Sequence, residues 1–159
     1  MIIIDLLENS LFAGIAAIGF GSISNIPLKS FPGCALLAAI AHTSRLVLMQ
    51  LCGWNIIMAS FVAAISIGLL SIPLAKFWRC PAEALSFPAL LPMIPGMYAY
   101  RAVQSLLICL QNKEEISFEH YFNLFNYNCM ICFLTMLMMA VGVLLPIFIF
   151  RSSSFSVTR

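Results

Sequence analysis

The chain has 159 residues, of which 62% are hydrophobic and only 9% are charged. An ordinary soluble domain has roughly 45–50% apolar and about 25% charged residues, so the composition excludes a soluble globular protein and predicts an integral membrane protein. The net charge of +2 is small and scattered, which gives no footprint for nucleic acid. Five spans of ~20 residues would fill most of the chain, which excludes a separate catalytic, nucleotide-binding or receptor domain.

The first predicted span covers residues 6–23 and ends before the helix-breaking Asn25-Ile26-Pro27. Asp5 precedes it where a signal peptide would carry Lys or Arg, so we expect the span to be retained. Small residues recur at four-residue spacing along the span, at Ala13, Ala17 and Gly21. Such a stripe is typical of a face on which membrane helices pack closely.

The second predicted span, 34–51, carries His42 and Arg45 among alanines and leucines. At 1.5 Å per residue Arg45 would lie roughly 16 Å deep, near the middle of a ~30 Å hydrocarbon core. A charge there costs roughly 2.5–3.5 kcal/mol and usually has a partner, yet the interior of the predicted spans holds no acid. The counter-ion is then an acid of another subunit or a substrate carboxylate. Alternatively, Arg45 donates to backbone carbonyls, or the segment is a re-entrant helix.

His42 lies three residues before Arg45, so both side chains are on one face of the helix. Its imidazole has an unperturbed pKa near neutral, which makes it a candidate proton carrier. The alternative is that His42 only makes hydrogen bonds between helices.

The third predicted span, 55–75, has a second small-residue stripe in Ser60, Ala64 and Gly68. Trp54 and Trp78 flank it and are expected at the two membrane interfaces, where tryptophan is enriched.

The fourth predicted span, 84–110, is interrupted by the sequence Leu91-Pro92-Met93-Ile94-Pro95-Gly96. Pro92 and Pro95 cannot continue a helix without losing backbone hydrogen bonds, which must be satisfied again inside a membrane. A second half-helix starting near Pro95 and Gly96 would present its positive dipole end to an anion, with Tyr100 and Arg101 within two turns. The alternative is a proline kink used only for packing.

The fifth predicted span, 121–150, is long enough to tilt. Four polar residues at its start are candidates to face the same cavity or to make hydrogen bonds between helices: Asn123, Asn126, Tyr127 and Asn128. Cys129 and Cys132 have C-x-x-C spacing, but with no second pair we expect apolar packing and no metal. No cofactor is expected, and without a pairing of nucleophile and base we do not expect an enzyme.

Lysine and arginine in the loops predict the orientation, since cytoplasmic loops are enriched in them. With five spans, one side holds Lys29, Lys76, Arg79, Arg151 and Arg159, and the other holds only Lys113. Treating 34–51 as a loop gives a weak bias of four against three. We therefore predict one all-α membrane domain over residues 1–159, with the N-terminus outside and the C-terminus cytoplasmic.

Three segments of the chain resemble the threonine/serine exporter family. They are Asn25-Ile26-Pro27, the stretch from Cys34 to Arg45 that contains His42, and Leu91–Gly96 followed by Tyr100. The similarity is to the small-subunit (YjjB-like) type, which works with a larger YjjP-like membrane subunit. Ala41 and Leu91 depart from the family pattern, where glycine and isoleucine are usual, and this leaves the substrate open.

The resemblance implies a bacterial inner-membrane exporter of small carboxylates, either threonine and serine or succinate, that is inactive without its larger subunit. Arg45, Pro95, Gly96, Tyr100 and Arg101 are then the candidate substrate-binding residues, and His42 or an acid of the partner couples export to protons. The alternative function is a structural or assembly subunit that does not transport, in which His42 and Arg45 only dock the partner.

Overall fold

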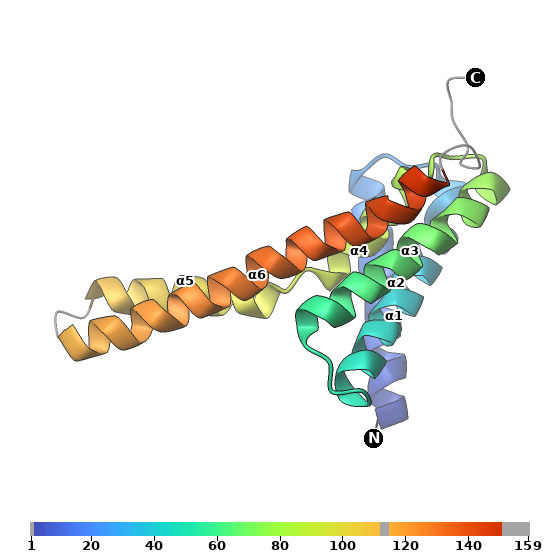
Figure 1. The fold of residues 1–159 in the computed structure, drawn as a ribbon. Coiled ribbons are helices and arrows are strands. Elements are labelled where there is room, and N and C mark those ends of the chain that lie inside the picture. Colours follow the sequence, from blue (N-terminus) through green and yellow to red (C-terminus); the bar gives the residue numbers. More distant parts are fainter. Residues whose placement is uncertain (1, 112–114, 151–159) are drawn as a thin grey trace. The chain divides into compact units, whose positions relative to one another are not determined.

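The structure is a computed structural model that describes residues 2–111 and 115–150, and within these ranges every regular element is a helix (Figure 1). In chain order they are α1 (Ile2–Ile23), η1 (Leu28–Ser30), α2 (Phe31–Gln50), α3 (Ile56–Trp78), α4 (Ala82–Leu90), η2 (Leu91–Met93), α5 (Gly96–Gln111) and α6 (Glu115–Ile149), where η denotes a short 3-10 helix. The all-α prediction is therefore confirmed for the described part of the chain.

Four helical stretches of the described chain are long and apolar enough to cross a membrane: Leu6–Ile23, Leu28–Gln50, Ile56–Trp78 and Ile116–Ile149. They coincide with the first, second, third and fifth predicted spans. The second begins six residues earlier than predicted, at Leu28, because η1 leads directly into α2. The chain has the character of a membrane protein, while the count of five spans and the orientation stay predictions.

The predicted fourth span, 84–110, is divided into two helices, α4 of nine residues and α5 of 16. At 1.5 Å per residue they are about 14 Å and 24 Å long, so neither alone crosses a ~30 Å core. The break lies at η2 and the following Ile94 and Pro95. Proline removes a backbone donor and clashes with the preceding turn, so the break predicted from the sequence is confirmed. A fifth crossing would need both pieces.

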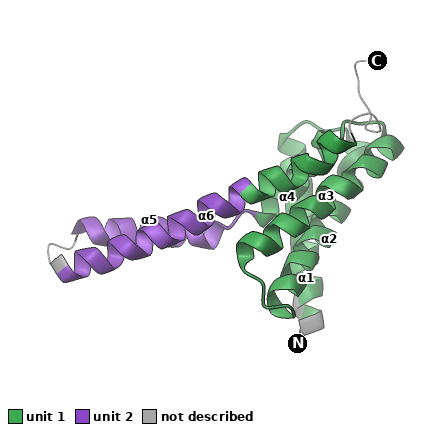
Figure 2. Ribbon diagram, viewed as in Figure 1, with its two compact units in different colours: residues 1–93, 138–159 green, residues 94–137 purple. Residues whose placement is uncertain are grey.

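The described residues form two compact units, which Figure 2 colours separately. Unit 1 contains α1 to η2 and the part of α6 that begins at Met138, and unit 2 spans Ile94–Leu137, with α5 and the first part of α6. A single domain over residues 1–159 stays a prediction.

In unit 1, α2 packs against α1, α3 and α4. The hydrophobic core of this unit, to which η2 and α6 also contribute, contains fully buried apolar side chains, the largest being Leu37, Ile67, Leu85, Met93, Met139 and Val143. Alanine fills many of the remaining core positions, such as Ala38 and Ala63. Because lipid tails are as apolar as leucine, close packing of small residues is a main source of helix association in membranes.

Both predicted small-residue stripes are buried. Ala17 and Ser60 are fully inaccessible, and a Cβ placed on Gly68 would lie 2.5 Å from the carbonyl oxygen of Val143 in α6. A Cβ on Gly142 would likewise lie 2.8 Å from the carbonyl oxygen of Phe61 in α3. These two glycines therefore allow α3 and the end of α6 to approach backbone to backbone. Gly68 belongs to the predicted stripe, whereas Gly142 and the pairing with α6 were not predicted.

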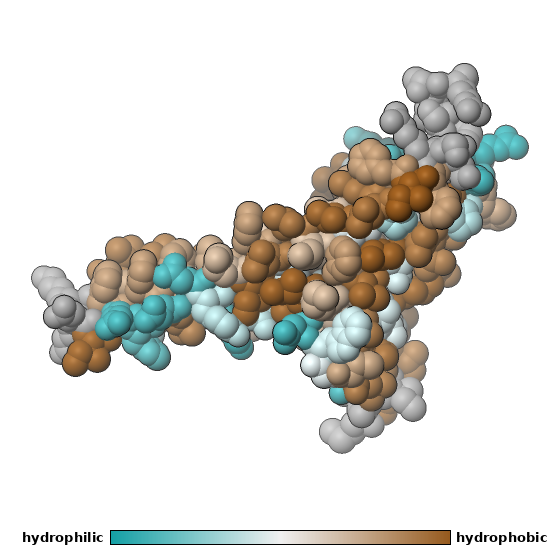
Figure 3. Space-filling view, viewed as in Figure 1, coloured by the Kyte–Doolittle hydropathy of each residue, from teal (hydrophilic) through white to brown (hydrophobic). Residues whose placement is uncertain are grey.

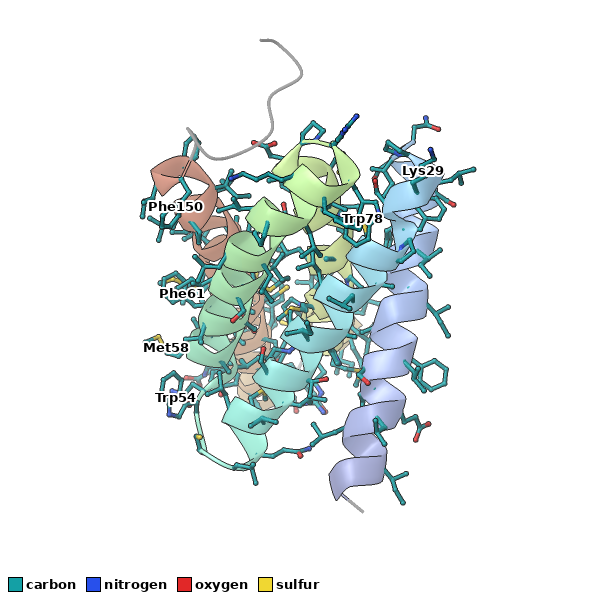
Figure 4. All side chains as sticks on the ribbon, turned by 90° about the vertical axis from the view of Figure 1, so that its right-hand side faces the viewer. Lys29, Trp54, Met58, Phe61, Trp78 and Phe150 are labelled. Atoms are coloured by element: carbon teal, nitrogen blue, oxygen red, sulfur yellow. The ribbon has the colours of Figure 1, made fainter. Side chains whose placement is uncertain are left out.

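Large apolar side chains cover the outside of α1, where Leu11, Phe12 and Ile15 are each more than 60% exposed. Apolar residues also cover much of the face drawn in Figure 3. In water such a surface would promote aggregation, whereas beside lipid it is the expected exterior. Trp54 lies at one end of unit 1 and Trp78 at the opposite end (Figure 4), which fits the predicted interface positions.

Candidate functional site

Arg45 lies near the C-terminal end of α2, five residues before its last residue, Gln50. At 1.5 Å per residue this is about 7–8 Å along the axis from the helix end. Because α2 is preceded by η1 and begins earlier than predicted, Arg45 is nearer to one end of the span than to its middle. The predicted depth of roughly 16 Å for Arg45 is therefore not found from either end of the span Leu28–Gln50.

The Arg45 guanidinium has two polar contacts within unit 1. Its Nη1 donates a hydrogen bond to the backbone carbonyl of Met93, and its Nη2 lies 3.3 Å from Nδ1 of His42. Met93 is the last residue of η2, and α5 begins only at Gly96. The Met93 carbonyl is therefore available to a side chain instead of to the next helical turn. The contact joins α2 to the broken segment, and it corresponds to the backbone-carbonyl alternative considered for Arg45.

The contact between Arg45 and His42 fixes the role of the imidazole. A guanidinium can only donate hydrogen bonds, so Nδ1 of His42 must accept, and its ring proton is on Nε2. His42 is thus neutral in this arrangement. A proton added at Nδ1 would replace the contact with repulsion between two cations, which links the protonation of His42 to the position of Arg45.

One nitrogen of Arg45 remains unsatisfied. Its Nε is buried and has no hydrogen-bond partner among the described residues. Burying a donor without a partner costs about 1–3 kcal/mol, and more for a charged group. Among the described residues the partners of Arg45 are a neutral carbonyl and a neutral imidazole, so an anion reaching this guanidinium would supply both the missing acceptor and the missing charge.

A second polar centre lies within unit 2, in a groove of about 610 Å³ between α5 and the first part of α6. The groove is lined by Tyr98, Arg101, Gln104, Ser105, Ile108, Tyr121, Leu124, Tyr127 and Asn128. Cys109 near the end of α5 donates to the carbonyl of Phe118 near the start of α6 at 3.7 Å, so the two helices form an antiparallel hairpin. On the face drawn in Figure 3, hydrophilic residues gather along this hairpin.

The remaining predicted site residues are at the start of α5. Pro95 is buried and Gly96 is the exposed first residue of the helix. The Gly96 N–H donates to the carbonyl of Ile94 at 2.8 Å, so one of the backbone donors expected to face an anion is already used. Tyr100 is 63% exposed and does not line the groove, unlike Arg101.

Arg45 and His42 belong to unit 1, whereas Pro95, Gly96, Tyr100 and Arg101 belong to unit 2. Hydrogen bonding brings the first two together, and one site that contains all six stays a prediction. Sequence reasoning missed Ser105 and Tyr121 as groove residues. Ser105 was detectable in principle, because it follows Arg101 by four residues on the same helix face.

The polar residues at the start of the fifth predicted span divide into two groups. Tyr127 and Asn128 line the groove, whereas Asn123 and Asn126 do not. Cys129 and Cys132 both have free thiols. Among the described residues, no group of three or more His, Cys, Asp and Glu side chains has a geometry that could hold a metal ion.

Comparison with known proteins identifies a family and similar sequences. The sequence model described as "Threonine/Serine exporter, ThrE" matches residues 9–149. A curated protein of Haemophilus influenzae (strain ATCC 51907 / DSM 11121 / KW20 / Rd), described as uncharacterized, is 38% identical over 104 residues, which are 65% of this chain and 35% of that protein. The matched part thus spans about a third of the length of this relative. No solved structure matches the chain.

Proposed function

The chain belongs to the threonine/serine exporter family, and we propose that it is one subunit of a two-component secondary transporter that exports small carboxylates across the bacterial inner membrane. The candidate substrates are threonine and serine, or succinate. The second component is a larger membrane subunit of the same family. The observation that carries the proposal is the family match over residues 9–149. It is joined by Arg45, a cation in a membrane-type helix that has no acidic partner among the described residues.

The length of the relative is compatible with a transporter that has a second membrane region. Since its 104 matched residues are 35% of its length, that protein is about 300 residues long, nearly twice the length of this chain. A protein of that size has room for a second membrane region beside the part that is similar to this chain. In the two-component arrangement that we propose, the larger subunit has the role of such a second region.

Arg45 supports a carboxylate as the transported group. Its guanidinium is held by Met93 and His42, and its Nε is buried without an acceptor. Arginine binds carboxylates in a planar, charge-assisted geometry. We propose that the substrate carboxylate, or an acid of the larger subunit in the empty state, completes the hydrogen bonding of Arg45.

His42 supports coupling to protons. Its neutral ring accepts from Arg45, so protonation of the ring and binding of a carboxylate to Arg45 affect the same guanidinium. We propose that a proton on His42 releases Arg45 from the imidazole and changes its affinity for the substrate. Alternating access requires two states that differ in substrate affinity, and this contact is a candidate for the element that distinguishes them.

A second function is favoured by the bond from Arg45 to Met93. Because this bond joins α2 to the broken segment, the residue has a structural role in the fold of unit 1. The alternative is therefore a subunit that assembles with a transporter without contacting the substrate, in which Arg45 maintains the docking surface.

Counterflow of labelled threonine, serine and succinate separates these functions. Vesicles would contain this chain with its larger subunit, this chain alone, or the pair with Arg45→Ala. We expect exchange only with both subunits, and a large loss of exchange in the variant while the complex still copurifies. Loss of copurification would support the docking role, and exchange at the normal rate in the assembled variant would reject a substrate role for Arg45.

A further inference from the structure

We propose that the groove between α5 and α6 in unit 2 is a ligand site of its own, and that its lining selects a monocarboxylate with a hydrogen-bond donor, such as an α-amino acid, over a dicarboxylate. The inference rests on the proposed function and names the substrate class that this groove accepts. Arg45, the cation on which the proposed function depends, is not one of the groove's lining residues.

The groove is of a size and character that fit a small polar solute. Its volume of about 610 Å³ lies within the roughly 300–1,000 Å³ usual for small-molecule sites. Seven of its nine described lining side chains carry a polar group, and the other two, Ile108 and Leu124, are apolar. The polar residues Tyr98, Arg101 and Ser105 follow each other at helical spacing on one face of α5, which is a costly face to turn toward lipid.

Among the described lining residues Arg101 supplies the only charge, and none of them is Asp or Glu. A groove with a single cation attracts an anion, and the fork of the guanidinium matches a carboxylate. One cation balances one carboxylate. A dicarboxylate would therefore bring a second negative group for which the lining offers no counter-charge.

The neighbouring polar side chains are oriented by local bonds that leave acceptors for the ligand. Ser105 donates its hydroxyl proton to the carbonyl of Arg101 at 2.8 Å, and Asn128 donates from Nδ2 to the carbonyl of Leu124 at 2.7 Å. Both residues are only 3% exposed. The hydroxyl oxygen of Ser105 and Oδ1 of Asn128 then remain as acceptors, which bind an ammonium or hydroxyl group and repel a carboxylate.

Three tyrosines complete the lining, namely Tyr98, Tyr121 and Tyr127. Tyrosine ring faces attract cations, with roughly 0.5–1 kcal/mol at exposed sites and more where water is excluded. The groove thus combines one site for a carboxylate with several weak sites for a positive or donating group. This division of charge fits a zwitterion.

The direct test is binding of labelled serine, threonine and succinate to the purified full chain in lipid nanodiscs. We expect the amino acids to bind better than succinate. Arg101→Gln should weaken amino-acid binding at least about tenfold, the typical effect of losing a charge-assisted hydrogen bond. Arg79→Gln is the matched control, because Arg79 is an exposed arginine of unit 1 and should leave binding unchanged.

A gain of binding tests the selectivity without depending on loss of function. Gln104 is exposed and lines the groove, whereas Gln111 is exposed on the same helix and does not line it. Gln104→Lys adds a second cation and should raise succinate binding relative to serine by about tenfold or more. Gln111→Lys, the same exchange seven residues away, should not.

Each outcome either supports or overturns the groove as the ligand site. Absence of binding to the full chain, equal binding by Arg101→Gln and Arg79→Gln, or equal ligand preference in the two lysine variants would overturn it. Loss of copurification with the larger subunit in Arg101→Gln, with binding to the isolated chain unchanged, would identify the groove as a docking surface instead. Counterflow distinguishes failure of the groove from failure of the proposed function. Normal exchange with Arg101→Gln would reject the groove as the ligand site and leave the proposed function intact. Binding that depends on the groove, without exchange in any vesicle, would reject the proposed function and leave the groove intact.

Discussion

The guanidinium of Arg45 in α2 donates to the backbone carbonyl of Met93, the last residue of η2 in the break that separates α4 from α5. A carbonyl at such a break has lost its partner in the next helical turn, and in a membrane every such group must be satisfied from within the protein. The arginine therefore has two roles at once. It donates a hydrogen bond to the free carbonyl of the broken segment. Its Nε, which has no partner among the described residues, can still donate to an anion.

Replacing Arg45 by lysine separates these two roles. Lysine keeps the positive charge, but it is a point charge and lacks the planar fork needed to contact Met93, His42 and an anion together. We expect Arg45→Lys to retain assembly with the larger subunit and to reduce exchange about tenfold to a hundredfold, the effect of one or two charge-assisted hydrogen bonds. The measurement is initial-rate counterflow in vesicles with equal amounts of complex.

Arg79→Lys is the control for this exchange, since Arg79 is an exposed arginine just beyond the end of α3. It should leave the exchange rate within about twofold of that of the unmodified protein. Full exchange in Arg45→Lys would show that only the charge matters and that the hydrogen-bond geometry at Met93 does not.

Substitution of His42 by asparagine tests proton coupling. The amide oxygen of asparagine keeps an acceptor near the position of Nδ1, which Arg45 contacts, but it cannot take up a proton at physiological pH. We expect His42→Asn to exchange substrate at close to the normal rate while export driven by a pH gradient falls at least about tenfold. The two rates are measured in the same vesicles, with and without an imposed gradient.

His120 provides a matched control, because it is the other histidine of the chain and is exposed in α6. His120→Asn should leave both rates unchanged. A proton-driven rate that survives in His42→Asn would assign the coupling to an acid of the larger subunit.

The sequence predicted the elements of this fold well where composition and proline control them. Long apolar runs predicted four of the helices, and Pro92 and Pro95 predicted the division of 84–110. These features are local, since a helix requires only a continuous apolar stretch and proline breaks it wherever it stands.

Contacts between distant segments were predicted less well. The position of Arg45 relative to His42 followed from helix spacing, but its bond to Met93 joins residues 48 positions apart, and no local pattern specifies such a pairing. The groove in unit 2 was found only in part for the same reason. Arg101 was recognised by its charge, and Ser105 could have been inferred from its spacing to Arg101, whereas Tyr121 gains its role only from the pairing of α5 with α6.

The close approach of α3 and α6 predicts that Gly68 tolerates no larger residue. A Cβ at this position would lie 2.5 Å from the Val143 carbonyl oxygen and 3.0 Å from Cγ of Pro146, so Gly68→Ala forces the helices apart. We expect a loss of about 1–3 kcal/mol in unfolding free energy, as for overpacked cores. The measurement is the midpoint of thermal or denaturant unfolding in detergent.

Gly19→Ala is the matched control in α1, because no atom lies within 4 Å of a Cβ placed there. Alanine has a helix propensity about 1 kcal/mol better than glycine, so this variant should unfold at the same midpoint or a higher one. A Gly68→Ala protein as stable as the Gly19→Ala protein would contradict the observed α3–α6 packing.

The sides of the membrane on which the two termini lie distinguish five crossings from four. Four described stretches have the length and composition of a span, and α4 with α5 would form the remaining crossing only if the two pieces together traverse the membrane. An odd number of crossings places the two termini on opposite sides. Reporters fused to each end, one active in the cytoplasm and one active outside, should therefore show the N-terminus outside and the C-terminus inside. The bias of five positive loop residues against one predicts this orientation.

A reporter inserted after Lys113, in the predicted outer loop, gives an independent reading and should resemble the N-terminal fusion. If instead the two termini report the same side, α4 and α5 enter and leave through one face as a re-entrant pair, and the unequal distribution of lysine and arginine has another cause.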